Sequence, residues 1–173
     1  MKATTTEQSP AQQRETLHDI VKGTRTVMLL SHGKDSKIEG RPMALVKVDD
    51  DTTIYLVTGI DSKKVADIVR EPRVSVSVQA RDGFVILDGE VRISQDRSLI
   101  DALWEDSWKV WFPDGAQDPT IAILIVTPNE GTYWNQDLGH TLSYLYRMVK
   151  ARVLGSEMEV KLGDQATVDL HKH

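Results

Sequence analysis

The chain has 173 residues, of which 40% are hydrophobic and 27% charged, and its formal net charge at pH 7 is −5. This length suffices for one domain with a hydrophobic core, and the acidic balance argues against a nucleic-acid partner. No apolar run approaches the roughly 20 residues that cross a bilayer, so no membrane partner is expected. With no cysteine, disulfides and thiol chemistry are excluded. The N-terminal stretch lacks the apolar centre of a signal peptide, which predicts a cytoplasmic location.

The N-terminal part of the chain predicts one helix and one strand. Residues 1–10 are polar and are expected to be disordered. A helix over residues 11–22 carries apolar side chains on one side and ends at Gly23. A strand over Thr26–Ser31 follows, and a polar loop leads from it to Glu39.

The middle of the chain has the patterns of β-structure. Two apolar runs, Met43–Val48 and Thr53–Thr58, flank the acidic turn Asp49–Asp51 and predict a β-hairpin. The stretch Arg73–Gln79 alternates valine with small polar residues, which is typical of a half-buried strand. A longer strand is predicted over Gly83–Ser94, with a kink or bulge at its Asp-Gly pair.

The segment Gln95–Trp111 predicts a helix, since its apolar residues recur at helical spacing. The stripe consists of Leu99, Ile100, Leu103 and Trp104. Three tryptophans, at positions 104, 108 and 111, follow one another at i, i+4 and i+7. The stripe predicts that at least Trp104 belongs to the core.

The C-terminal part begins with Ile121–Val126, six apolar residues in a row, which predicts a central strand buried on both faces. A turn is predicted at Pro128–Gly131, and a short strand at Thr132–Asn135. An amphipathic helix is predicted over His140–Val153, and the chain after Gly155 is polar. Apart from the first ten residues, we therefore expect one domain over 11–155 and a polar tail over 156–173.

About six strands with helices inserted between hairpins, and no regular βαβ alternation, predict an α+β fold built on an antiparallel barrel. Three cations are expected to converge at one end of the hairpin: Arg41 before its first strand, and Lys63 and Lys64 after its second. Asp61-Ser62 predicts the N-cap of a helix that runs to about Arg70, with Val65, Ile68 and Val69 on one face. A helix N-terminus beside three cations suits a phosphate dianion. From spacing alone, solvated charges at strand ends are slightly favoured.

Short motifs in a characteristic order carry a resemblance to a known family. They are Arg41-Pro42-Met43, the strand ending at Thr58, Ser62-x-Lys64, Glu71-Pro72-Arg73-Val74-Ser75-Val76, Trp108-Lys109-Val110-Trp111-Phe112-Pro113, Asp118-Pro119, Thr127-Pro128 and Tyr133-Trp134. Over roughly residues 14–155 the chain resembles the FMN-binding split-barrel superfamily, and within it the general stress proteins of the pyridoxamine 5'-phosphate oxidase-like branch. The resemblance implies an antiparallel split β-barrel of about six strands with flanking helices.

The resemblance also implies a flavin site. The flavin phosphate is expected at Arg41, Ser62 and Lys64, with Lys63 as an additional cation. The ring is expected against the strand residues Pro42, Met43, Ala44, Val57 and Thr58. For Met43 and Val57, simple core packing is an equal alternative.

The tryptophan segment has two interpretations. Trp108 and Trp111, with Phe112, would form an aromatic wall over a ligand or an interface, or would pack in the core. In related split barrels the flavin lies between two subunits, so the resemblance implies a homodimer with flavin at its interface. The apolar run Ile121–Val126 and the tryptophans also favour a C2 dimer, because they exceed what one small barrel readily buries.

Other polar groups give weaker signals. The carboxylates of Asp49–Asp51 are typical of a solvated turn, His32 of an exposed loop, and the terminal His171-Lys172-His173 of a mobile end. No Ser-His-Asp spacing, HExxH or GxGxxG occurs, so neither a metal site nor a hydrolase or Rossmann site is expected.

The expected function is therefore a flavin-binding redox protein of the general stress type, with FMN as the cofactor and FAD as a weaker second ligand. The alternative is a non-catalytic flavin store or sensor. Haem handling is a third interpretation, but no histidine occupies an obvious ligand position. The C-terminal segment departs from that of true pyridoxamine-phosphate oxidases, which argues against pyridoxal-type substrates.

Overall fold

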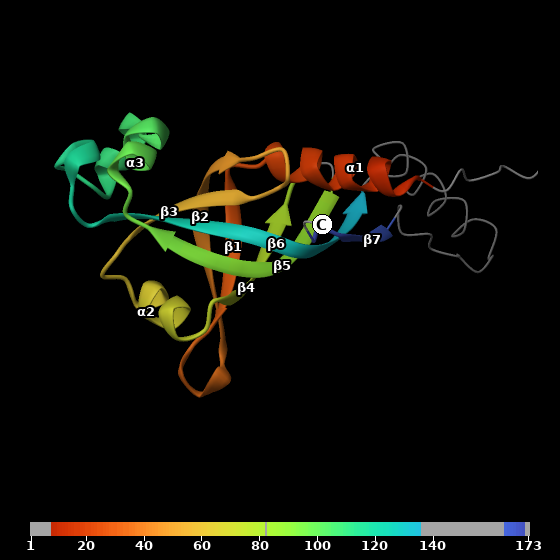
Figure 1. The fold of residues 1–173 in the computed structure, drawn as a ribbon, viewed down its shortest axis with the longest axis horizontal. Coiled ribbons are helices and arrows are strands. Elements are labelled where there is room, and N and C mark those ends of the chain that lie inside the picture. The colour runs from red at the N-terminus through yellow and green to blue at the C-terminus, as the bar shows by residue number, and fades with distance from the viewer. Residues whose placement is uncertain (1–7, 82, 136–164, 172–173) are drawn as a thin grey trace, which may run out of the picture.

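The computed structural model describes residues 8–81, 83–135 and 165–171, in which seven strands form one sheet flanked by three helices (Figure 1). The elements, with short 3-10 helices labelled η, are α1 (Pro10–Lys22), β1 (Thr26–His32), η1 (Lys34–Ser36), β2 (Ile38–Val48), β3 (Ile54–Gly59), α2 (Lys63–Arg70), β4 (Arg73–Gln79), β5 (Gly83–Ser94), α3 (Arg97–Leu103), η2 (Asp106–Val110), η3 (Gly115–Gln117), β6 (Ile121–Asn135) and β7 (Gln165–Asp169).

The sheet closes into a barrel because β3 pairs with β6. The strand order is β3-β2-β1-β4-β5-β6, and every pairing is antiparallel. Strand β6 pairs with β5 on one side, and it pairs with β3 along Ile121–Val126 and with β7 along Glu130–Trp134. The α+β antiparallel split barrel of six strands is therefore confirmed.

The first half of β6 is buried on both faces, as its apolar run predicts. Leu124 and Val126 point into the barrel core, whereas Ile121, Ile123 and Ile125 belong to a second cluster outside the barrel. That outer cluster also contains Val57, Ile100, Trp108 and Phe112. The side chains alternate between the two faces of a strand, so two layers of packing require an unbroken apolar run.

The turn predicted at Pro128–Gly131 is wrong, because β6 continues through it to Asn135. The pairing shifts there by one residue: Asp88 lies opposite Glu130, and Gly89 opposite Pro128. This is a β-bulge, which lets a strand bend without ending. The predicted irregularity at Asp88-Gly89 is confirmed, and a Cβ at Gly89 would lie 2.2 Å from the carbonyl oxygen of Thr127.

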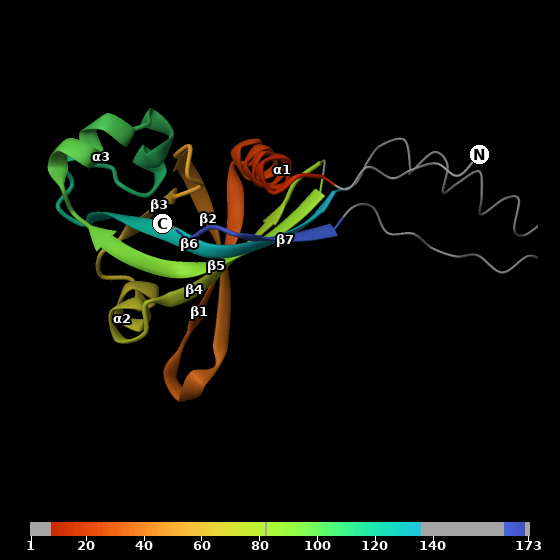
Figure 2. The ribbon, with the colours of Figure 1, turned by 45° about the vertical axis from the view of Figure 1, so that its right-hand side comes forward.

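Helix α1 confirms the first predicted helix. Ser9 caps its N-terminus in a capping box with Gln12, and Pro10 occupies the first helical turn. The buried side chains of α1 are Leu17, Ile20 and Val21, which join the barrel core. In Figures 1 and 2, α1 and β7 lie towards one end of the barrel, and α2 and α3 flank the other end.

The single helix predicted over Gln95–Trp111 is wrong in its length. Helix α3 ends at Leu103, and η2 follows after two residues in extended conformations. The break turns Trp108 inward, where it is 2% exposed, and leaves Trp104 half-buried with its ring edge-on to Trp108 at 5.5 Å. Trp104, expected in the core, packs against the outer cluster but is only partly buried, and Trp108 is the fully buried tryptophan.

Two further differences concern α2 and the C-terminal part. Val69, predicted to share one face of α2 with Val65 and Ile68, is 73% exposed, and the third buried residue of α2 is Asp67. Strand β7 was not predicted, since the segment is polar and lies on one edge of β6. The helix predicted over His140–Val153 lies outside the described residues. Within the described ranges, no helix is long and apolar enough to cross a bilayer.

Candidate functional site

A cavity opens where strands β2 and β3 separate. The two strands pair only along Leu45–Val48 and Ile54–Leu56, with an irregularity in register between Leu45 and Lys47. Beyond that point β2 stays with β1 and β3 stays with β6. The segments Pro42–Ala44 and Val57–Gly59 therefore diverge and form the two walls of a notch.

Pro42 suits this position because it leaves no N–H to pair. The N–H of Leu45 bonds the carbonyl of Arg25, on the β1 side. Successive N–H groups of a strand point to alternate sides, so the nitrogen of Pro42 faces the notch. A proline is tolerated in a strand where its nitrogen lies on an unpaired edge.

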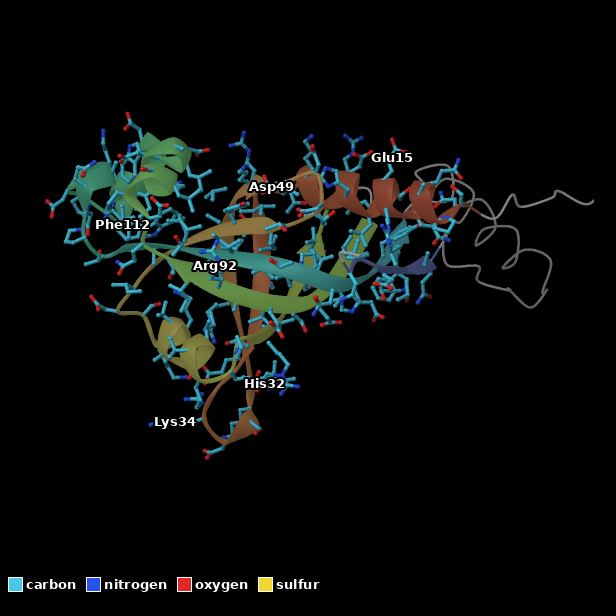
Figure 3. The ribbon with its side chains drawn as sticks, viewed as in Figure 1. Glu15, His32, Lys34, Asp49, Arg92 and Phe112 are labelled. Atoms are coloured by element: carbon cyan, nitrogen blue, oxygen red, sulfur yellow. The ribbon has the colours of Figure 1, made fainter. Side chains whose placement is uncertain are left out.

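The cavity has a volume of about 460 Å³ and is lined by Pro42, Met43, Ala44, Val57, Thr58, Gly59, Asp61, Ser62, Lys64, Trp111, Phe112 and Thr120. Its walls are apolar along β2 and β3, with Met43 and Val57 buried. Phe112, labelled in Figure 3, is also buried, whereas Trp111 is 61% exposed. An apolar cleft with a few convergent polar groups is the usual form of a small-molecule site.

The polar groups gather at the start of α2. The hydroxyl of Thr58 accepts a 2.8 Å hydrogen bond from Lys64 Nζ and lies 3.4 Å from the hydroxyl of Ser62. Ser62 is the N-cap of α2, but its side chain makes no capping bond. The first N–H groups of a helix have no acceptor within it, so this end presents donors and a positive dipole.

The charge of Lys64 is poorly compensated at this end of the cavity. Partial burial lowers the pKa of its ammonium group, and the nearby positive charge of Arg41 lowers it further. Both effects disfavour the charged form. An anion bound beside Lys64 would offset both effects by favouring the charged form, so the site suits negatively charged ligands.

Nine of the twelve residues expected at the flavin site line this cavity. The exceptions are Arg41, Lys63 and Trp108. Arg41 donates to the hydroxyl of Ser31 at 3.1 Å and pairs with Glu39, and Lys63 pairs with Glu39 and Asp67. Trp108, a residue of η2, is buried in the outer cluster.

Three lining residues are not among the expected site residues: Gly59, Asp61 and Thr120. Gly59 and Asp61 directly neighbour predicted residues and could have been included on that ground. Thr120 comes from a loop distant in sequence. The carbonyl of Thr120 accepts a 2.7 Å hydrogen bond from the N–H of Ile60, which holds that loop in place. Its position depends on the pairing of β3 with β6, which the sequence alone does not specify.

The acidic turn forms part of the hairpin. Asp49 accepts a 2.6 Å bond from the hydroxyl of Tyr55 and pairs with Lys47 at 2.7 Å. Asp51 accepts a bond from the N–H of Thr53. Among the described residues, no group of three or more acidic or histidine side chains is arranged to hold a metal ion.

A closed antiparallel barrel with a cavity in the gap between two diverging strands defines the split-barrel class of proteins. The protein-family model for pyridoxamine 5'-phosphate oxidase-like proteins matches residues 12–159, and the chain belongs to that family, in its general stress protein branch. No curated protein matches the sequence.

Solved structures of general stress proteins share the fold. One from Jannaschia sp. CCS1, assigned as general stress protein 26, is 25% identical, with a TM-score of 0.70 over 92% of this chain and 99% of that one. General stress protein 26 from Bacillus anthracis is 25% identical, with a TM-score of 0.63 over 70% and 93%. The general stress FMN/FAD binding protein from Xanthomonas citri is 24% identical, with a TM-score of 0.62 over 90% and 100%.

Proposed function

We propose that the cavity between β2 and β3 binds a flavin mononucleotide. The observation that carries the proposal is the convergence of Lys64, Ser62 and Thr58 at the start of α2, next to an apolar notch. A structural neighbour from Xanthomonas citri is described as an FMN/FAD binding protein, which supports the same ligand class.

The lining residues fit the two parts of this ligand. Lys64 and the hydroxyls of Ser62 and Thr58, with the helix N-terminus, suit a phosphate dianion. A Cβ at Gly59 would meet no atom within 4 Å, so there is free space beside these groups. Pro42, Met43 and Ala44 would lie along the ring, since small and apolar side chains permit close approach of a flat group.

The chemistry would be that of the bound flavin, which transfers hydride or electrons. Among the cavity-lining residues that the structure describes, Asp61 and Lys64 are the ionisable ones, and Lys64 is assigned to the phosphate. The chain therefore binds and orients the cofactor, and we infer an oxidoreductase with an unidentified acceptor. The scarcity of proton-transferring side chains equally supports a flavin store or sensor without turnover.

We also propose a homodimer with the cavity near its interface. The run Ile121–Val126 and Trp108 are buried within the chain, so they no longer supply the surplus apolar surface expected from the sequence. Val110 and Trp111 supply it instead: they are 80% and 61% exposed, and Trp111 lies at the cavity.

Titration of the purified protein with FMN, followed by absorbance and fluorescence, tests the binding proposal. Saturable binding with perturbed spectra is expected, and no binding at micromolar concentrations would overturn the proposal. Anaerobic addition of NADH or NADPH then separates the two roles. Bleaching of the bound flavin supports an oxidoreductase, and an unchanged spectrum with both donors favours a store or sensor.

FMN is expected to bind more tightly than FAD, but by less than about 30-fold, a difference of roughly 2 kcal/mol. Both ligands would use Thr58, Ser62 and Lys64 for the first phosphate. Asp61 is exposed, so an adenylate could extend past it into solvent. Calorimetry with both flavins on the same apoprotein measures the difference, and complete exclusion of FAD would contradict it.

A further inference from the structure

The Glu39 carboxylate pairs with Arg41 and Lys63, the two cations that were expected to bind the phosphate but do not line the cavity. Glu39 Oε2 lies 3.4 Å from Arg41 Nη2, and both carboxylate oxygens of Glu39 bind Lys63 Nζ. The Glu39 side chain is 37% exposed and that of Arg41 is 18% exposed. The hydrogen bond to Glu39 is the main reason that the pKa of Lys63 is raised.

Local structure places this carboxylate. Glu39 and Arg41 are two residues apart in β2, so they lie on the same face of the strand. The β1–β2 loop supplies Gly33, where a Cβ would lie only 2.6 Å from Glu39 Oε1. The absence of a side chain at position 33 therefore leaves room for the carboxylate.

Both cations adjoin residues of the cavity. Arg41 shares a face of β2 with Met43, the next residue along that face, which lines the cavity. Lys63 lies between Ser62 and Lys64, which also line it. The charge of Arg41 already acts on the ammonium group of Lys64. A modest change of side-chain conformation would thus direct either cation towards a bound anion.

We propose that Glu39 is an internal anion that competes with the ligand's phosphate for Arg41 and Lys63, and so limits the affinity of the cavity for phosphorylated ligands. This inference rests on the flavin site proposed above. Glu39 holds the two cations in a charge-assisted arrangement when no phosphate is bound. A phosphate dianion carries more charge than a carboxylate, so it draws Arg41 away from Glu39.

The two cations do not respond equally. Asp67 lies 3.6 Å from Lys63 Nζ, so Lys63 keeps an ion-pair partner when Glu39 is removed. The remaining hydrogen-bond partners of Arg41 are neutral, the Ser31 hydroxyl and the Glu39 carbonyl, and the Asp67 carboxylate acts on Arg41 only as a more distant charge. Loss of the Glu39 charge is therefore expected to change the affinity for phosphate mainly through Arg41.

Glu39→Gln tests the inference, with FMN and riboflavin as paired probes. Riboflavin has the same ring and no phosphate. The variant is expected to bind FMN about fivefold more tightly than the wild type, the equivalent of one weak ion pair, and riboflavin equally well. Glu71→Gln is the matched control, because Glu71 pairs with Arg73 at the same two-residue spacing but lies away from the cavity. It should change neither affinity.

A second variant protects the test against a folding defect in the first. Gly33→Ala places a methyl group against the flexible end of Glu39, so it displaces the carboxylate without removing it. FMN affinity should again rise relative to riboflavin. Combining Arg41→Ala with Glu39→Gln should abolish most of the gain.

The outcomes separate this inference from the proposed function. Flavin binding by the wild type, with an FMN-to-riboflavin affinity ratio that is unchanged or lower in Glu39→Gln and Gly33→Ala, would overturn the role of Glu39 alone. No flavin binding by the wild type would overturn both.

Discussion

Lys64 Nζ donates a 2.8 Å hydrogen bond to the hydroxyl of Thr58, and this bond links the first turn of α2 to the C-terminal end of β3. The bond fixes a cation at one end of the cavity, where Ser62 also points at the Thr58 hydroxyl. Because the Thr58 hydroxyl is neutral, this bond leaves the positive charge of Lys64 free to pair with a bound anion. This arrangement distinguishes Lys64 from Lys63, whose charge is taken up by carboxylates.

Replacing Lys64 with alanine is expected to weaken FMN binding by about 1.5–3 kcal/mol, the usual contribution of a hydrogen bond to a charged group. Thr58→Val should weaken it by less, since its hydroxyl is neutral. Fluorescence titration measures both. Lys34→Ala serves as the control, because Lys34 lies on the β1–β2 loop away from Phe112 (Figure 3). Wild-type affinity in the double variant Arg41→Ala, Lys64→Ala would contradict the phosphate site.

Lys64→Met should stabilise the free protein slightly, by less than about 1 kcal/mol, because solvent still screens the partly buried ammonium group. Its pKa is lowered from 10.5, so the unfolded chain binds the proton more tightly than the folded one. The destabilisation of the folded state by charged Lys64 is fully present below the lowered pKa and disappears as the pH rises past 10.5. Thermal melts at pH 7 and pH 11 should show a gain only at pH 7. A loss of stability at pH 7 would contradict this account.

The Glu71–Arg73 ion pair is expected to stabilise the protein at neutral pH and to lose this effect in acid. Side-chain and backbone hydrogen bonds from Arg73 lower its pKa from 4.5 to about 2. The stabilisation is therefore present above pH 4.5 and is lost as the pH falls from 4.5 towards 2. Urea melts of Glu71→Gln should be less sensitive to pH across that window than those of the wild type. Parallel curves for the two proteins would show that the ion pair contributes nothing.

Gly89→Ala should destabilise the protein by about 3 kcal/mol, at the upper end for overpacking, because the added Cβ would meet backbone rather than a movable side chain. Gly59→Ala is the control, since a Cβ there has free space. Chemical denaturation compares the two. Equal stability of both variants would mean that the β5–β6 bulge relaxes freely.

Trp111→Ala should weaken the proposed dimer without lowering the stability of the fold, because 61% of the side chain is exposed. Phe112→Ala, which empties a buried position, should instead cost about 3–5 kcal/mol. Sedimentation equilibrium measures the first effect, with Val69→Ala as an exposed apolar control. A flavin-bound wild type that is monomeric at micromolar concentration would overturn the dimer.

The sequence by itself determined the elements whose signals are local. The alternation in Arg73–Gln79 and the unbroken apolar run Ile121–Val126 report directly which faces are buried, because a strand's side chains alternate. Family motifs likewise placed Pro42–Ala44 and Ser62 at what the structure describes as one cavity. In each case the information lies within a few neighbouring residues.

Tertiary structure decided the pairings between distant segments. The break after Leu103 accompanies the burial of Trp108 in the outer cluster, and Thr120 reaches the cavity through its bond to Ile60. Arg41 and Lys63 lie next to the cavity in sequence, yet Glu39 holds their charges elsewhere. A side chain's partner depends on which groups the closed barrel brings within a few ångströms, and residue spacing along the chain does not encode that choice.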